Sequence, residues 1–105
     1  MGPDDIYWKL VEEFCQDPDV EDSTMMGHDC LRLNGEFFGM INGRRQLVVK
    51  LPAERVNELV DAGVGENVAP AGRVFREWVA IPEPDEATWR GYLSEAKAFV
   101  SRQFA

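Results

Sequence analysis

The sequence has little positive charge, and it contains no long apolar run. Its 105 residues carry 11 Lys and Arg against 19 Asp and Glu, a formal net charge of −8. Because DNA-binding proteins gain much of their affinity by neutralising phosphates, this balance argues against direct DNA binding. The apolar stretches span only a few residues, whereas a membrane helix needs about 20. The first residues, MGPDDIYW, lack the basic and apolar parts of a signal peptide, so we expect a cytoplasmic protein with no membrane partner.

The single histidine and the two cysteines also limit the chemistry. Cys15 and Cys30 are too few for a disulfide scaffold, and we expect Cys15 to be buried and Cys30 half-buried. A Cys/His zinc site would need both cysteines, His28 and a carboxylate. His28 and Cys30 lie two residues apart, whereas catalytic Cys/His pairs usually come from separate elements. Since no P-loop, GxGxxG, HExxH, GxSxG or EF-hand pattern occurs either, we expect no catalytic residue, metal or cofactor.

The acidic residues are concentrated near the start of the chain. Residues 1–31 contain nine Asp and Glu but one lysine, whereas residues 32–105 contain ten acidic and ten basic residues. The first segment therefore carries the whole excess of negative charge. Such a surface is either a solvated acidic face or a docking surface for a basic partner.

The hydrophobic pattern predicts a single α+β domain over residues 1–105, with the order α-β-β-β-α-(β)-β-α. A first helix is expected from about Asp4 or Asp5 to Gln16, with Trp8 widening its apolar stripe, and residues 17–28 are expected to form a polar loop. Two Asn-Gly turns predict an antiparallel meander of three strands. After the meander we expect a helix that follows Pro52, a short edge strand, a longer strand and a last helix capped by Asp85. The five strands are expected near residues 30–33, 36–41, 46–51, 68–69 and 73–81.

Two charged residues interrupt apolar strands. Lys50 lies at the end of the third strand, and Glu77 lies in the middle of the last one beside Trp78, which we expect in the core. A buried charge is costly unless it is paired, so Glu77 is expected to pair with Lys50 or with an arginine across the sheet. The alternative is a polar cleft that contains His28, Lys50, Glu77 and Trp78.

Four arginines form a candidate basic patch. Arg44 and Arg45 lie at a predicted hairpin tip, and Arg73 and Arg76 lie at the start of the last strand. A direct nucleic-acid-binding function would require all four on one face, despite the acidic total.

Several features occur together between residues 24 and 102. Met26-Gly27 precedes the strands, Phe38 follows the Gly35 turn, and Lys50-Leu51-Pro52 ends a strand. They are followed by the Pro-Ala-Gly at 70–72, by Glu77-Trp78 and by the amphipathic last helix. In these features the chain resembles the N-terminal domain of the TfoX/Sxy family and the wider MmcQ/YjbR-like group. The resemblance implies a curved antiparallel sheet flanked by helices, like that of secretion chaperones.

The resemblance also implies a regulatory role. Full-length TfoX/Sxy proteins are bacterial positive regulators of natural competence, thought to work with the cyclic-AMP receptor protein at promoters. The family supplies no catalytic residue to transfer. We therefore expect a non-enzymatic regulatory or protein-interaction module with a protein partner, and direct DNA binding is disfavoured. A nucleic-acid-binding protein and a small-ligand-binding domain are the alternatives.

Overall fold

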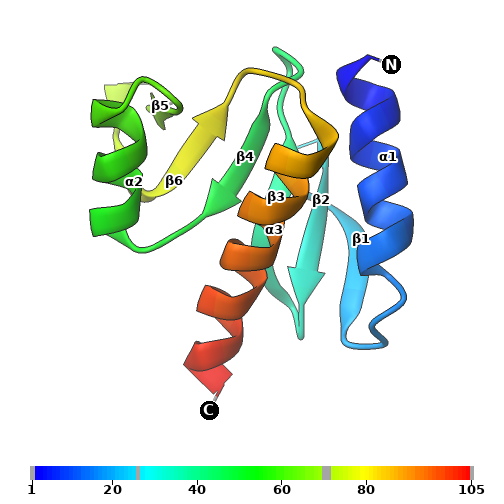
Figure 1. The fold of residues 1–105 in the computed structure, drawn as a ribbon. Helices are drawn as coiled ribbons and strands as arrows, with labels where there is room; N and C mark the ends of the chain where they lie inside the picture. Colours follow the sequence, from blue (N-terminus) through cyan, green and yellow to red (C-terminus); the bar gives the residue numbers. More distant parts are fainter. Residues whose placement is uncertain (1, 26, 70–71, 105) are drawn as a thin grey trace.

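The computed structural model describes residues 2–25, 27–69 and 72–104 and has the expected α+β architecture, a curved antiparallel sheet flanked by helices (Figure 1). The described residues form six strands in the spatial order β1-β2-β3-β4-β6-β5, with every neighbouring pair antiparallel. The elements are α1 (Pro3–Phe14), β1 (Val20–Met25), β2 (His28–Leu33), β3 (Glu36–Ile41), β4 (Leu47–Lys50), α2 (Ala53–Asp61), β5 (Glu66–Val68), β6 (Phe75–Ile81), α3 (Glu86–Ser101) and the short 3-10 helix η2 (Arg102–Phe104).

The last helix, α3, lies across the middle of the sheet (Figure 1). Its start is capped as expected, because the Asp85 carboxylate accepts a hydrogen bond from the backbone N–H of Thr88 at 2.9 Å. Its buried residues recur every three or four positions, so one side of the helix packs on β2, β3 and β4. These residues are Trp89, Leu93, Ala96 and Val100.

The main core lies between the helices and one face of the sheet. Tyr7 and Leu10 of α1, Val56 and Leu59 of α2 and the buried side of α3 all belong to it. At Gly39 of β3, a Cβ atom would overlap the Cδ2 atom of Leu93. The absence of a side chain at this position therefore lets α3 approach the centre of the sheet.

The other face of the sheet carries a second, smaller apolar cluster that contains no helical residue. Its side chains come from β2, β3, β4 and β6 and are Cys30, Phe37, Met40, Val48 and Ala80. Partly buried side chains from β1, β5 and β6 pack at its margin: Met25, Val68 and Trp78. Cys30, expected to be half-buried, is fully buried here, and Cys15, expected to be buried, is partly exposed at the end of α1. We call the sheet surface that carries this second cluster the helix-free face.

The prediction of a polar loop at residues 17–28 is wrong, because residues 20–25 form strand β1. β1 pairs with β2 along its whole length, from Val20 opposite Leu33 to Met25 opposite His28. The sheet thus has six strands rather than about five, in the order α-β-β-β-β-α-β-β-α. Only Val20 of this strand is buried, so the alternation of buried and exposed residues that marks most strands is nearly absent from its sequence.

One further expectation is wrong, and part of another falls outside the described residues. Trp8 does not widen the core, because it lies on the flank of α1 with 42% of its surface exposed. Met26, Pro70 and Ala71, which carry part of the family resemblance, lie outside the described residues.

Gly91 offers a test of α3 that leaves the core untouched. It is an exposed residue inside the helix, and a Cβ atom there would meet no atom within 4 Å. Gly91→Ala is therefore expected to raise the free energy of unfolding by about 0.5–1 kcal/mol, because alanine restricts the unfolded backbone more than glycine does. Urea denaturation followed by circular dichroism measures this change. A loss of stability would contradict the open surroundings of Gly91.

Candidate functional site

Three of the four residues of the predicted polar cleft lie together. Lys50, Glu77 and Trp78 line a shallow hollow of about 280 Å³, together with Phe75 and Arg76. His28 does not line this hollow. It begins β2 and lies next to Gly43, where a Cβ atom would be 3.7 Å from the imidazole Cε1.

The prediction of an ion pair between Lys50 and Glu77 is wrong. The Lys50 Nζ atom bonds Glu36 Oε1 at 2.8 Å, and the Glu77 side chain is exposed. In the β4–β6 register Lys50 lies opposite Trp78, and neighbouring residues of a strand point to opposite faces. The register therefore pairs Lys50 with Trp78 rather than with Glu77, and the Glu77 backbone carbonyl accepts a hydrogen bond from the Leu51 N–H at 2.8 Å.

Trp78 lies on the helix-free face and not in the main core. Its ring contacts Phe37 and Phe75, with ring centroids 4.8 Å and 4.7 Å apart, and it remains partly exposed. The sequence could not distinguish the two faces of β6, because both carry apolar residues.

The four arginines of the candidate basic patch do not come together. Arg44 and Arg45 lie in the turn between β3 and β4, and Arg45 forms an ion pair with Asp4 at 3.5 Å. Arg76 is the second residue of β6, and Arg73 lies just before this strand. Because β4 and β6 are antiparallel and Leu47 pairs with Ile81, the two arginine pairs lie at opposite ends of this ladder.

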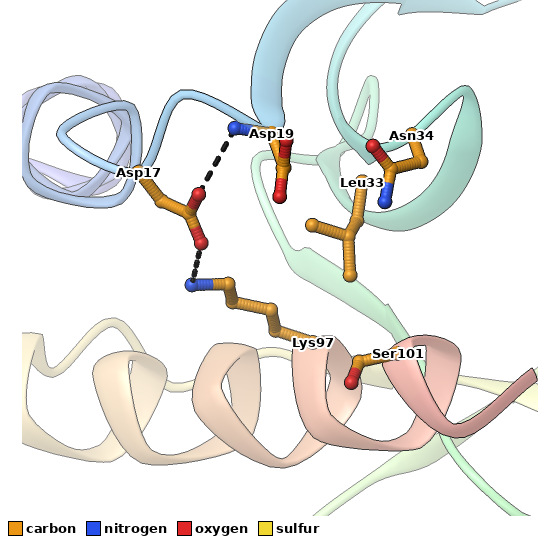
Figure 2. Close-up of a pocket in the computed structure, with 6 residues that line it drawn as sticks. All are labelled: Asp17, Asp19, Leu33, Asn34, Lys97 and Ser101. Atoms are coloured by element: carbon orange, nitrogen blue, oxygen red, sulfur yellow. Dashed lines mark hydrogen bonds and ion pairs between the residues drawn. The ribbon is translucent and has the colours of Figure 1, made fainter. Parts of the chain in front are cut away.

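Part of the acidic excess is neutralised by bases from later in the chain. On the side of α1 that faces α3, Arg90 bonds Glu13 at 2.7 Å, whereas Lys9, the one base of residues 1–31, bonds Glu86 of α3 at 2.9 Å. At the end of α1, Lys97 reaches Asp17 at 2.7 Å (Figure 2).

The Asp17 contact belongs to a polar pocket of about 300 Å³ between the α1–β1 loop and the end of α3 (Figure 2). Asp17 also accepts a hydrogen bond from the Asp19 backbone N–H at 2.9 Å. The bonds from Lys97 and from this N–H hold the pKa of Asp17 below its ordinary value. The pocket is thus an internally satisfied contact between two parts of the fold, lined by Asp17, Asp19, Leu33, Asn34, Lys97 and Ser101.

A second side of α1, about 100° around the helix from Lys9 and Glu13, keeps its negative charge. Trp8 and Glu12 are one helical turn apart there, and α1 lies along the edge of the sheet that β1 forms (Figure 1). Asp22 of β1 and Asp29 of β2 face the same side as the core residues Val20 and Leu31, next to α1. We call Trp8, Glu12, Asp22 and Asp29 the α1–β1 flank. None of its three carboxylates has an ion-pair partner among the described residues.

The polar groups of this flank affect one another. Partial burial and the neighbouring Asp29 carboxylate raise the pKa of Asp22. The hydroxyl of Tyr7, which is fully buried beneath the flank, has no hydrogen-bond partner among the residues that the structure covers. Burial raises the pKa of Tyr7 above its ordinary value, and Cys30, Asp22 and Asp29 add to the shift. The fold thus holds negative charge and an unsatisfied polar group together at one edge of the sheet.

The sequence placed the acidic excess in the right segment but missed the flank itself. The charge count indicated residues 1–31, whereas the sequence did not predict strand β1 and predicted Trp8 in the core.

The described part of the chain contains no group of three or more His, Cys, Asp and Glu side chains placed to hold a metal ion. Within the same residues, no helix has the length and apolar character to cross a bilayer. No protein-family model, curated protein or solved structure matches this chain.

Proposed function

We propose that this chain is a non-enzymatic protein-interaction module, and that its α1–β1 flank binds a basic region of a protein partner. The observation that carries this proposal is the contrast between neutralised and unpaired acids in α1 and the strands beside it. Glu13, on the side facing α3, is neutralised by Arg90, whereas Glu12, Asp22 and Asp29 have no cation among the described residues. Charges left unpaired at an exposed surface raise the rate and the selectivity of association with a partner of opposite charge.

The resemblance to the TfoX/Sxy N-terminal domain supports a regulatory role for this module, acting through a protein partner in the cytoplasm. Direct DNA binding is the weaker alternative. It would need a continuous basic surface, whereas Arg44 and Arg45 lie far along the sheet from Arg73 and Arg76.

The proposal predicts that partner capture depends on the charge of the flank. The full chain, immobilised, would be exposed to lysate of the source cells beside two variants of equal net charge. The flank variant is Glu12→Gln with Asp22→Asn and Asp29→Asn. The control carries Glu54→Gln, Asp61→Asn and Glu83→Gln, which neutralise three exposed acids without an ion pair among the described residues. Mass spectrometry is expected to find proteins that the flank variant retains at least about tenfold less than the wild type and the control do.

Circular dichroism melts would establish that both variants fold. Equal retention of every protein on all three baits would contradict the proposal. So would a shift of duplex DNA by low-micromolar protein that persists near about 150 mM salt, where exposed charges are strongly screened.

A further inference from the structure

The β1 strand presents an unused backbone edge. It pairs with β2 on one side, and no strand of the described residues lies on its other side. Outside the β1–β2 ladder, the backbone of residues 21–25 makes no hydrogen bond to another backbone group of the described chain. The Thr24 carbonyl receives only a long contact of 3.5 Å from the Arg32 guanidinium. An edge strand of this kind has free N–H and C=O groups at alternate residues, which a further strand can bond.

The side-chain alternation of β1 defines what an added strand would meet. Val20 belongs to the main core, so Asp22 and Thr24 face the helix side, whereas Met25 packs against the cluster of the helix-free face. Every second side chain of a strand placed beside β1 would therefore lie next to α1. The intervening side chains would extend the helix-free face beyond Met25.

The helix side of this edge is suited to cations. The Trp8 ring, 42% exposed and one helical turn from Glu12, can stack with an ammonium or guanidinium group. Asp22 and Asp29 supply carboxylates on the helix side of β1 and β2, and the buried Tyr7 hydroxyl near them has no partner within the described chain. The helix side of this edge thus offers unpaired carboxylates and open backbone groups, and α1 beside it carries an exposed aromatic ring.

We propose that β1 accepts an extended segment of the partner as an added strand, with Lys or Arg at every second position against Trp8, Glu12 and Asp22. This inference rests on the proposed function and specifies its partner and its binding mode. A second copy of the chain is a poorer occupant, because pairing two β1 edges would bring Glu21 and Asp22 of both copies together. Like charges directly opposite each other on paired strands are destabilising.

The test uses the full chain and synthetic peptides that alternate Lys with Thr. Two further copies of the peptide are N-methylated, one at every Lys and one at every Thr, so that each keeps the charge and loses one row of N–H donors. Because only one row can face β1, one methylated copy is expected to bind at least about tenfold more weakly than the parent and the other nearly as well. Hydrogen exchange measured by NMR is expected to slow at the amides of β1 when the parent peptide binds.

Two substitutions locate the binding surface. Trp8→Ala is expected to weaken binding of the parent peptide severalfold through loss of the ring, whereas Trp78→Ala, on the helix-free face, leaves it unchanged. A copy with Glu in place of Lys is expected not to bind.

The possible failures separate the two proposals. If both methylated copies bind as well as the parent, or if β1 exchange is unaltered, strand addition is wrong while charge-dependent partner capture stands. If no Lys–Thr peptide binds although the flank still controls capture from lysate, strand addition is likewise wrong. If capture itself is insensitive to the flank, the proposed function fails.

Discussion

Trp89→Ala is expected to lower the free energy of unfolding by about 3–5 kcal/mol, the range found when a large aromatic side chain is removed from a core. Trp89 is fully buried in the first turns of α3 and belongs to the cluster that joins the helices to the sheet. Truncation would leave a cavity between these layers. Urea denaturation measures the change.

Two companion variants make this result specific. Trp89→Phe is expected to cost less, because it keeps most of the volume and removes an indole N–H that has no partner among the described residues. Trp8→Ala is expected to cost less than Trp89→Ala, since Trp8 is 42% exposed. A loss below about 1 kcal/mol for Trp89→Ala would mean that α3 does not pack on the sheet as described.

Gly39→Val is expected to lower the free energy of unfolding by about 2–3 kcal/mol, because overpacking a well-filled core forces side chains or backbone to move. A Cβ atom at position 39 already overlaps Leu93, and valine adds two further methyl groups. The same substitution in a Leu93→Ala background is expected to cost less, since the truncated side chain leaves room for it.

A double-mutant cycle of Gly39→Val and Leu93→Ala measures this compensation directly. We expect a favourable coupling of at least about 1 kcal/mol, as for residues that share one space in the core. Additive losses would show that the strain at position 39 arises elsewhere than at Leu93.

Most of the elements follow from local chemistry. Asp85 caps α3 as predicted, and the Asn-Gly turns separate β2, β3 and β4. The buried positions of α3 follow from helical spacing alone. Strand β1 was missed for an equally local reason. It is an edge strand with only one buried residue, so no hydrophobic alternation marks its sequence.

Pairings across the sheet follow different rules. Lys50 and Glu77 are both ionic and both lie at or near apolar strands, and their types alone suggested a pair. The register instead places Lys50 opposite Trp78 and within 2.8 Å of Glu36. One residue of register decides the face to which a side chain points, and strand order decides its neighbours.

By itself, the sequence determined the α+β class, the capped start of α3, the hairpin turns and the segment that carries the negative charge, because these depend on residues close together in the chain. Only the tertiary structure decided which acids are neutralised. Arg90 and Lys97 reach back to Glu13 and Asp17 because α3 lies beside the end of α1, whereas no base of the described residues forms an ion pair with Asp22 at the open edge of the sheet. Ion pairs form between side chains that the fold brings within a few ångströms, and residues 77 to 80 positions apart in the chain meet only through packing.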